Sequence, residues 1–412
     1  MASTIPQALL PRPELRAALA IAGKVVERRT HKPILTNVLL RDGADGFEVV
    51  ATNLDMAVTA RIPSAIADSD FSIALPHHAL ATLEKRAAAT DDVTAEITDP
   101  GSPPVSEDRE RGTEARPAKP GATTLRFGSV SCSMQATSAA EWPEMRIEGD
   151  IKADFEVATA DLLAALTATE FAISTEETRY YLNGVYMHHL PPHYEGAGAR
   201  LAFVSTDGHQ MAVHEMSAPT GTAKMPGVII PRKTIAFLRS LCKAKKAPAT
   251  VRIVVNTVKA MFTLGSVTVL TKLVDGTFPD YVRAMPPSSS VFRVTVDRNA
   301  LAEAVRAVSS VSSERGRTVK LAIADERITA SCDNLDLGSV SAAVPCDLIS
   351  DSRHGPYIDI GFNARHLLDI LANVDAGTFG TVILGVNDPG SPVLIRGSSG
   401  VATQYVLMPM RV

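Results

Sequence analysis

The stretch Phe47-Glu-Val-Val-Ala-Thr-Asn-Leu-Asp-Met56 sets the architecture of the chain, because its pattern returns further along. Its closing quartet, Asn53–Met56, nearly coincides with Asn334-Leu-Asp-Leu337, which ends a stretch that begins at Arg327. Thr206-Asp-Gly-His209 occupies the matching place in the middle of the chain. A polar turn at the same point of three units predicts one supersecondary design that occurs three times.

Helices and strands surround each turn in the same order. A helix with small and aliphatic residues at i, i+3, i+4 and i+7 precedes each strand pair. These first helices are predicted at Glu14–Arg28, Asp161–Ile173 and Arg298–Ser310, with Asp161 and Asp297 as candidate N-caps of the last two. A second helix is predicted in each copy at His77–Arg86, Arg232–Lys243 and Asn363–Val374. Each copy closes with a strand meander, at Val93–Ile97 with Thr124–Gln135, Val251–Val255 with Ala260–Leu273, and Thr381–Val386 with Val393–Met408.

The expected fold class is therefore α+β, with three tandem domains in which two helices pack on β-sheet. The domains are predicted at residues 1–148, 153–286 and 291–412, and the second boundary falls in the linker Pro286–Ser290. Asp99–Thr123, inside the first domain, is rich in proline, glycine and charge and has almost no large apolar residue. Such a composition predicts a flexible loop between two strands of a hairpin.

The composition of the 412 residues excludes several classes of protein. A net charge of −4 gives no overall attraction to nucleic acid, so DNA binding has to rest on where the charges lie. The four cysteines form no C-x-x-C pair and have no zinc-like spacing to histidines, so we interpret them as reduced structural thiols. No apolar run approaches the ~20 residues of a membrane helix, which predicts a soluble, cytoplasmic protein.

Several segments resemble the signature segments of the bacterial DNA polymerase III beta subunit, the sliding clamp family. They fall in the family's order and span the triplicated chain: Arg179-Tyr-Tyr-Leu-Asn-Gly-Val-Tyr, Ser205-Thr-Asp-Gly-His, Pro231-Arg-Lys, Asp275-Gly-Thr-Phe-Pro-Asp-Tyr and Tyr405-Val-Leu-Met-Pro-Met-Arg-Val. The resemblance implies a DNA-clamp fold in which each chain is half of a closed ring, so that a head-to-tail homodimer encircles double-stranded DNA without sequence specificity. It implies a non-enzymatic processivity factor that tethers the DNA polymerase III alpha subunit, the clamp loader and other proteins with clamp-binding motifs. No cofactor and no metal are implied.

Basic residues supply the candidate DNA contacts. On a predicted helix from Arg232 to Lys246, positions 232, 239, 243 and 246 share one face, opposite to the apolar side chains of Ile235, Leu238 and Leu241. A basic helix face attracts duplex DNA without reading bases, although a solvated helix face is the commoner explanation of such a run. With the resemblance, the candidate DNA-binding residues are Lys24, Arg28, Arg29, Tyr180, Tyr181, Arg232, Lys233, Arg239 and Lys243.

The resemblance also implies a pocket between the second and third domains that accepts short extended peptides of partner proteins. The matching residues are Arg179, Leu182, Thr206, Gly208, His209, Met211, Pro279, Arg283, Leu407, Met408, Pro409, Met410 and Arg411. The leucine and methionine side chains would form an adaptable apolar floor, and the histidine and arginine would fix the peptide's orientation. Without the resemblance, the apolar tail is simply the end of a closing strand.

The sequence departs from the family pattern at a few positions. Gln210 stands where the family often has a basic residue, and Met211 replaces the usual leucine. Together with the long segment Asp99–Thr123, these departures keep open an accessory or mobile-element paralogue with altered partners.

Two other classes of function compete with a clamp. An enzyme would need the histidine pairs His77-His78 and His188-His189 to converge with acidic groups, but the pairs lie in different copies and no nucleotide-binding or hydrolase motif occurs. A groove-reading DNA-binding module would need a recognition element, and no helix-turn-helix or zinc-finger pattern is present. We therefore predict no catalytic residues.

Overall fold

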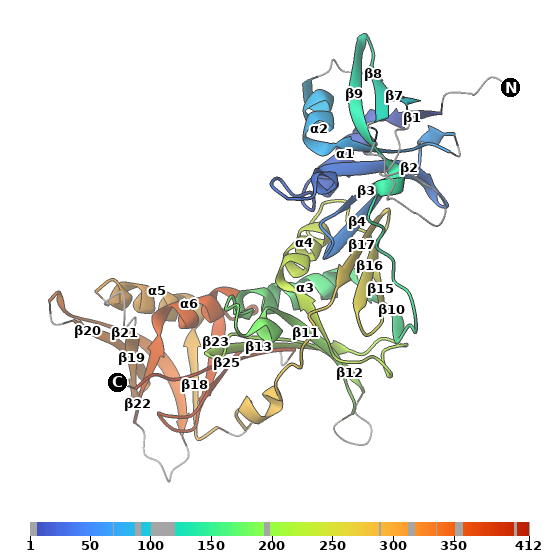
Figure 1. Ribbon diagram of the computed structural model, residues 1–412. Helices are drawn as coiled ribbons and strands as arrows, with labels where there is room; N and C mark the ends of the chain where they lie inside the picture. Colours follow the sequence, from blue (N-terminus) through green and yellow to red (C-terminus); the bar gives the residue numbers. More distant parts are fainter. Residues whose placement is uncertain are drawn as a thin grey trace. The chain divides into compact units, whose positions relative to one another are not determined.

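The computed structural model describes residues 6–68, 70–86, 92–99, 119, 121–192, 198–287, 290–311, 318–334, 336–350, 357–398 and 402–411. The chain divides into two compact units. The first comprises residues 1–157 and 244–272, and the second comprises residues 158–243 and 273–412. Each unit is built around one extended sheet with helices packed against it (Figure 1).

The sheet of the first unit has the strand order β10-β15-β16-β17-β4-β3-β2-β6-β9-β8-β7-β1-β5. Its helices are α1 (Arg12–Ala22) and α2 (His77–Arg86), which pack against each other. Its strands are β1 (Gln7–Pro11), β2 (Asn37–Gly43), β3 (Gly46–Thr52), β4 (Met56–Ile62), β5 (Ile66–Ala67), β6 (Ser72–Pro76), β7 (Asp92–Asp99), β8 (Gly121–Phe127), β9 (Val130–Ser138), β10 (Ala153–Ala158), β15 (Thr250–Val255), β16 (Lys259–Leu264) and β17 (Val267–Lys272).

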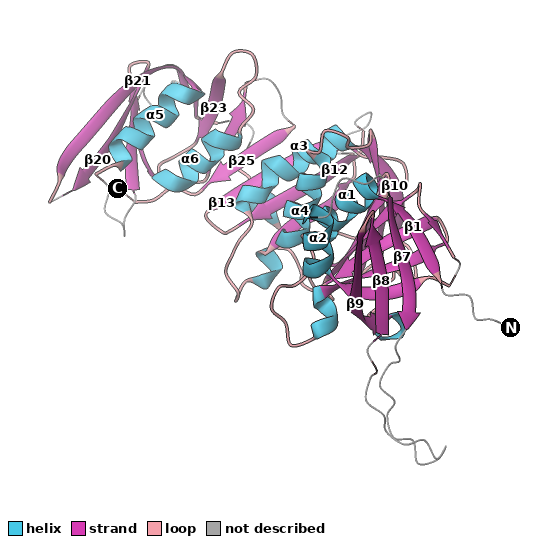
Figure 2. Cartoon of the chain, turned by 90° about the horizontal axis from the view of Figure 1, so that it is seen from above, coloured by secondary structure: helices cyan, strands magenta, loops and turns pink. Residues whose placement is uncertain are grey.

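The sheet of the second unit has the strand order β14-β11-β12-β13-β25-β24-β23-β18-β21-β20-β19-β22. Two helix pairs cover it, α3 (Thr159–Thr169) with α4 (Arg232–Cys242), and α5 (Arg298–Ser309) with α6 (Ala364–Asn373), the latter visible over their strands in Figure 2. Its strands are β11 (Gly184–Leu190), β12 (Arg200–Thr206), β13 (Gln210–Ser217), β14 (Val228–Pro231), β18 (Phe292–Asp297), β19 (Thr318–Ala324), β20 (Arg327–Asn334), β21 (Gly338–Ser350), β22 (Ile358–Asn363), β23 (Thr381–Val386), β24 (Val393–Gly397) and β25 (Thr403–Leu407).

Short 3-10 helices complete the described structure, at Pro33–Thr36, Ala139–Glu141, Glu170–Ala172, Tyr180–Leu182 and Tyr281–Ala284. Two of them replace the starts of predicted strands, because the chain makes a turn before it enters β2 and β11. The predicted α+β class with three repeated sets of helices and strands is confirmed, and neither sheet closes into a barrel. None of the helices in the described ranges is long and apolar enough to cross a membrane.

The helix α5 shows why the repeated pattern folds as it does. Leu301, Val305 and Val308 follow helical spacing and are fully buried against the sheet. The side chain of Asp297 accepts a hydrogen bond from the Ala300 backbone N–H at 2.7 Å, which confirms the predicted N-cap. Burial of such aliphatic side chains is worth about 1.5–3 kcal/mol each, so this stripe holds the helix in place.

Several predicted helix ends differ from the observed ones, and α3 for example spans Thr159–Thr169 rather than Asp161–Ile173. The first helix ends at Ala22 rather than Arg28, because Gly23 follows and the His77 ring lies where a side chain would stand, with Cε1 2.6 Å from an added Cβ. Asp161 lies in the first turn of α3 rather than capping it, since that helix begins at Thr159. The helix α4 ends at Cys242, and the N–H of its C-cap Lys243 still donates to the carbonyl of Arg239.

The repeated polar turn is the same in all three copies, but the middle copy is offset by one residue from the predicted alignment. Asn53 Oδ1 accepts from the N–H groups of residues 55 and 56, and Asn334 Oδ1 accepts from those of residues 336 and 337. In the middle copy, Asp207 Oδ1 accepts from residues 209 and 210 at 2.8 and 2.9 Å. The matching quartet is therefore residues 207–210, and Thr206 corresponds to Thr52.

The predicted flexible loop Asp99–Thr123 lies mostly outside the described residues. Its ends belong to strands, because Asp99 closes β7 and residues 121–123 open β8. Lys119 Nζ contacts Asp99 Oδ2 at 2.8 Å. The expectation of a hairpin at this place is thus confirmed for the two strands.

Candidate functional site

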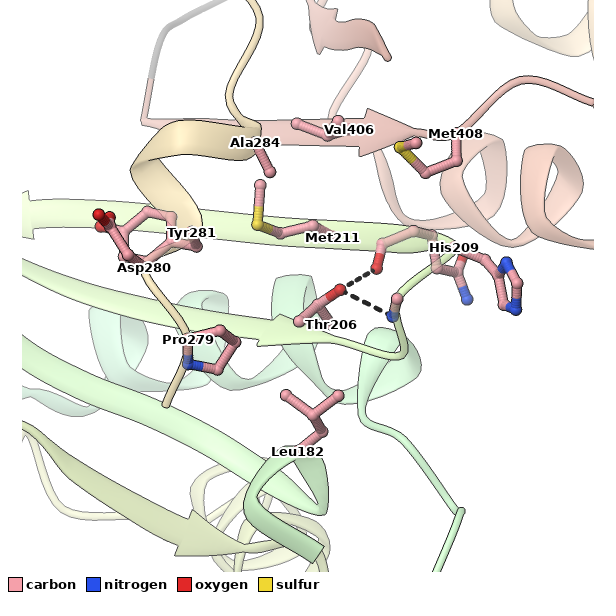
Figure 3. A pocket seen from close by; sticks show the side chains of 12 residues that line it. Leu182, Thr206, His209, Met211, Pro279, Asp280, Tyr281, Ala284, Val406 and Met408 are labelled. Atoms are coloured by element: carbon pink, nitrogen blue, oxygen red, sulfur yellow. Dashed lines mark hydrogen bonds between the residues drawn. The ribbon is translucent and has the colours of Figure 1, made fainter. Parts of the chain in front are cut away.

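A cavity of about 210 Å³ opens in the second unit beside the paired strands β13 and β25 (Figure 3). It draws residues from the turn before β13, from the 3-10 helix near Tyr281 and from the end of β25. Its lining residues are Leu182, Thr206, Gly208, His209, Gln210, Met211, Pro279, Asp280, Tyr281, Ala284, Val406 and Met408.

The floor of this cavity is apolar. Leu182, Met211 and Val406 are almost completely buried and belong to one hydrophobic cluster. No residue of α5 or α6 belongs to that cluster, whereas Tyr405 and Leu407, the neighbours of Val406, pack with those helices. Successive side chains of a strand point to opposite faces, so the cavity lies on the sheet face away from α5 and α6.

An aromatic stack supports one wall. The rings of Tyr186 and Phe278 are 4.8 Å apart and nearly parallel, and His188 stacks on the other side of Tyr186 at 4.6 Å. The hydroxyl of Tyr281 lies 3.0 Å from His188 Nε2. Burial lowers the pKa of His188 and raises the pKa of Tyr281, so both groups are neutral near pH 7 and rigidify the wall without adding charge.

The turn at one end of the cavity is held by its own hydrogen bonds. Thr206 Oγ1 donates to the carbonyl of Gln210 at 2.8 Å and accepts from the N–H of Gly208 at 3.0 Å. Gly208 has a φ of +92°, and an added Cβ would lie 2.7 Å from Arg179 Nη1. A glycine is therefore required for the turn and for the guanidinium that lies against it.

Charged and polar groups gather beside this turn. The rings of His209 and His366 stack with centroids 5.8 Å apart, and His366 Nδ1 lies 4.0 Å from Asp207 Oδ2. Burial lowers the pKa of His366, which keeps its imidazole neutral near pH 7. Gln210 donates to Asp207 Oδ2 at 3.2 Å, while its own Oε1 has no protein partner. Polar contacts within the chain thus fix this end of the cavity, and His209 is its exposed polar side chain.

The structure brings seven of the predicted pocket residues together around the cavity. These are Leu182, Thr206, Gly208, His209, Met211, Pro279 and Met408. Arg179 lies behind the turn, with Nη1 3.5 Å from the Asp207 carbonyl, and Arg283 is exposed and paired with Asp280 at 3.0 Å. Both lie next to the cavity without lining it.

Only one of the predicted tail residues, Leu407 to Arg411, lines the cavity, because neighbouring side chains on a strand point to opposite faces. Leu407 points into the core on the helix side of the sheet, and Met408 donates its N–H to the His209 carbonyl at 2.9 Å. Met410 leaves the cavity altogether, because its N–H donates to the Gly361 carbonyl at 2.8 Å in an isolated bridge. Pro409 and Arg411 do not line the cavity either.

Sequence reasoning missed five lining residues, Gln210, Asp280, Tyr281, Ala284 and Val406. The alternation of side chains along β25 would have selected Val406 together with Met408 and excluded Leu407. The 3-10 helix that places Tyr281 and Ala284 has no comparable period, so its contribution could not be found in that way.

Comparison with known proteins identifies the family. Residues 9–103, 156–280 and 283–411 match the N-terminal, central and C-terminal domains of the DNA polymerase III beta subunit. The chain is 35% identical over 405 residues to the beta sliding clamp of Caulobacter vibrioides, covering 98% of this chain and 99% of the relative. The chain belongs to the DNA polymerase III beta subunit family. Its members are sliding clamps, the non-catalytic processivity factors of that polymerase.

Other relatives agree over nearly the whole length. The beta sliding clamp of Pseudomonas aeruginosa is 28% identical over 404 residues, with 98% of this chain and 99% of the relative covered. A crystal structure of the Caulobacter crescentus beta sliding clamp matches with a TM-score of 0.84 at 34% identity, covering 99% of this chain and 100% of that one. A sliding clamp from Bartonella birtlesii bound to griselimycin matches with a TM-score of 0.81 at 32% identity, covering 98% and 99%.

The candidate DNA residues of this clamp-family chain fall into two groups, one in each unit. In the second unit, Arg232 and Lys233 are exposed on the first turn of α4, while Ile235, Leu238 and Leu241 are buried on its other face, as predicted. Lys243 is exposed just after the helix. Arg239 is partly neutralised, because its Nε lies 2.5 Å from Glu170 Oε2. Lys245 and Lys246 lie beyond the helix, so the predicted face does not extend to them.

Tyr180 and Tyr181 belong to the 3-10 helix before β11. Their rings are 5.8 Å apart and edge-on, and Tyr180 is 53% exposed. In the first unit, Lys24, Arg28 and Arg29 are exposed on the segment after α1 rather than on the helix itself. They are therefore placed by a turn, and not by helical spacing as predicted.

Proposed function

We propose that two copies of this chain join head to tail in a ring around double-stranded DNA, and that the cavity beside β13 and β25 binds short extended peptides of partner proteins. The partners are the DNA polymerase III alpha subunit, the clamp loader and other proteins with clamp-binding motifs. The chain acts in the cytoplasm, where bacterial DNA is replicated. The observation that carries the peptide site is an open apolar cavity whose floor is fixed by a sheet and whose rim carries hydrogen-bonding groups.

The chemistry of the cavity suits an extended peptide with apolar anchors. Met211 and Met408 are flexible thioethers that adapt to side chains of different shape. The exposed rim residue His209 can bind the polar groups of the same peptide. Solved structures of similar clamps carry ligands too, among them a Pseudomonas aeruginosa sliding clamp bound to griselimycin.

The proposed DNA contacts are electrostatic. Arg232, Lys233 and Lys243 are exposed around α4, and Lys24, Arg28 and Arg29 form a second exposed group. Such cations attract phosphates without reading sequence, which is what a protein that slides along DNA requires. Tyr180 and Tyr181 add ring surface next to the first group.

The domain boundaries follow from the same proposal. We place the domains at residues 1–148, 153–286 and 291–412, and the family matches at residues 9–103, 156–280 and 283–411 follow the same order. In the proposed dimer, the first domain of one copy contacts the third domain of the other. Such a head-to-tail contact gives a closed ring only if the rotation that relates one copy to the next divides a full turn.

Binding of a short peptide that contains glutamine and leucine tests the site. Titration calorimetry should show binding to the parent chain and none to Met211→Arg, because the arginine would introduce a buried charge into the apolar floor. The matched control is Met216→Arg, which alters the same strand outside the cavity lining. Equal binding by the parent and Met211→Arg would refute the pocket.

An accessory clamp with altered partners is the second candidate. The observation that favours it is Gln210, a buried lining residue whose Oε1 has no protein partner. An assay of processive DNA synthesis by the replicative polymerase of the same organism distinguishes a replicative clamp from an accessory clamp. Stimulation of that polymerase supports the replicative role, and stimulation of only an accessory polymerase supports the paralogue.

A further inference from the structure

A second cavity, of about 310 Å³, lies wholly within the first unit, where a linker crosses the sheet next to β4 and β17. Its floor is formed by Val50, Ala57 and Leu270, each at most 8% exposed. Its rim is formed by the linker residues Pro143 and Met145. The floor is therefore apolar and the rim comes from a short extended segment, as in the first cavity.

The internal repeat makes the floors of the two cavities equivalent. Met211 pairs with Val406 across β13 and β25, and Ala57 pairs with Leu270 across β4 and β17. The backbone continues in the same way in both places. Met408 N–H donates to the His209 carbonyl at 2.9 Å, and Lys272 N–H donates to the Asp55 carbonyl at 2.8 Å.

The turns beside the two cavities are equivalent as well. Thr206 Oγ1 donates to the carbonyl four residues later at 2.8 Å, and Thr52 Oγ1 does the same at 3.2 Å. Each threonine also accepts from the N–H two residues later, at 3.0 Å in both copies. Two threonines with the same bonds thus stand at the same end of two cavities.

The linkers share a short pattern of residue types. Trp142-Pro143-Glu144 crosses the second cavity, and Phe278-Pro279-Asp280 crosses the first. Trp142 is buried in a cluster with Leu39 and Val50, so it anchors this linker to the sheet. An aromatic residue, a proline and a carboxylate thus follow one another in both linkers, and the proline and carboxylate line the cavity in each case.

One difference separates the two cavities. The residue after the carboxylate is Tyr281 in the first cavity and Met145 in the second, and Met145 Sδ lies 3.3 Å from Thr52 Oγ1. Met145 therefore lies against Thr52. The equivalent threonine, Thr206, lines the first cavity without such a methionine. The position of Met145 shows that an unbranched apolar side chain on an extended backbone fits beside Thr52 in the second cavity.

We propose that this second cavity is a weaker binding site for the same class of short extended peptide, in which Met145 occupies the anchor position until a peptide side chain displaces it. The proposal rests on the proposed function of the first cavity. Its occupant is a peptide with an unbranched aliphatic or methionine anchor. The rim guanidinium of Arg41, held by Glu48 at 2.8 Å and by Glu144, borders the position without entering the apolar floor.

Displacement of Met145 determines the expected affinities. Removing a packed methionine side chain from an apolar surface weakens peptide binding on the order of tenfold to a hundredfold relative to an open site. Met145→Ala should therefore strengthen the second site and leave the first unchanged. Met261→Ala is the matched control, because Met261 lines the same cavity from β16, whereas the sulfur that lies on Thr52 is that of Met145.

The experiment uses the full chain and a glutamine-containing peptide in which an unbranched photoreactive analogue of methionine stands at the anchor position. Titration calorimetry should give one strong site per parent chain, and a second site in Met145→Ala but not in Met261→Ala. Crosslinks mapped by mass spectrometry should include peptides around Ala57 and Leu270 at high ligand in the parent chain. This mapping requires no variant, so it is decisive even if a variant fails to fold.

The outcomes separate the two claims. Met211→Arg should remove the strong site and leave the weak one, with crosslinks confined to the second cavity. If Met145→Ala still binds one peptide and no crosslink maps to 50–57 or 267–272, the second site is refuted while the first stands. If Met211→Arg leaves strong binding intact and the crosslinks avoid 206–211, the proposed function of the first cavity fails instead.

Discussion

At the scale of single residues, strand alternation decides which parts of the tail can bind a partner. Val406 and Met408 line the cavity, while Leu407 between them packs into the core on the other face. Met410 lies at Gly361, away from both. Two methionines two positions apart therefore differ in position, because the backbone leaves β25 after Leu407 and Met410 bridges to β22.

This difference gives a paired prediction. Met408→Ala should weaken binding of the glutamine- and leucine-containing peptide about tenfold, because it removes apolar surface from the cavity rim. Met410→Ala should leave the affinity within about twofold, since its side chain lies outside the cavity. Calorimetry on the two variants measures both values. A larger loss for Met410→Ala than for Met408→Ala would contradict the assignment of the tail.

Buried histidines predict how stability depends on pH. Burial lowers the pKa of His188, His214 and His366, so each is less easily protonated in the folded chain than in the unfolded one. As the pH falls below the unfolded value of about 6.5, the unfolded chain takes up protons first, and the free energy of unfolding decreases until the lower folded pKa is passed.

This decrease in the free energy of unfolding should appear as a lower urea midpoint at about pH 5.5 than at about pH 7. His214→Gln should reduce the difference, because glutamine does not titrate and can keep the bond that His214 Nδ1 makes with Thr403 Oγ1 at 2.7 Å. A difference that is the same in the parent and the variant would show that His214 does not contribute to it.

At the scale of elements, most helices and strands could be predicted, and their ends could not. The pattern at Leu301, Val305 and Val308 identifies α5, and Asp297 marks its start. The end of α1 depends instead on a contact with His77, 54 positions beyond Gly23 in the printed sequence, and no local pattern records it.

The same distinction applies to the candidate site. The resemblance supplied the turn and the strand end, because those segments carry recognisable residues. The 3-10 helix with Tyr281 was not predicted, since its position depends on packing against His188 rather than on periodicity. The short pattern Trp142-Pro143-Glu144 is visible in the sequence. That this segment borders a cavity can be recognised only when the pairing of β4 with β17 is known.

The exposed cations of α4 predict how DNA binding depends on salt. Neutralising Arg232, Lys233 and Lys243 together should reduce the magnitude of the salt slope, by roughly 0.9 for each phosphate contact that is lost. Arg239→Ala should change it less, because Glu170 already pairs with that guanidinium. Binding to duplex DNA measured over a series of salt concentrations gives the slope. An unchanged slope in the triple variant would place this surface away from DNA.

At the scale of the whole molecule, the repeat connects domains through continuous sheets. The second unit carries β13 of the middle domain beside β25 of the last, and the first unit carries β4 of the first domain beside β17 of the middle one. Main-chain hydrogen bonds between paired strands hold each junction together, in addition to side-chain packing. Both junctions leave a cavity next to the crossing linker, and these two cavities are the proposed sites for extended peptides.

The proposed ring predicts a dimer in solution. Analytical ultracentrifugation at micromolar concentration should give twice the 43.7 kDa mass of one chain. Met211→Arg should sediment in the same way, because the cavity lies within one unit of one chain. A monomer at all concentrations up to that range would rule out a stable head-to-tail ring.

Topological retention on DNA tests the central claim most directly. The chain is loaded by its clamp loader onto a nicked circular duplex and isolated by gel filtration, and the circle is then cut once with a restriction enzyme. The account predicts that the chain remains on the circle at high salt and leaves after linearisation, because a ring slides off a free end. Equal retention on circular and linear DNA would contradict encirclement and favour ordinary groove or phosphate binding.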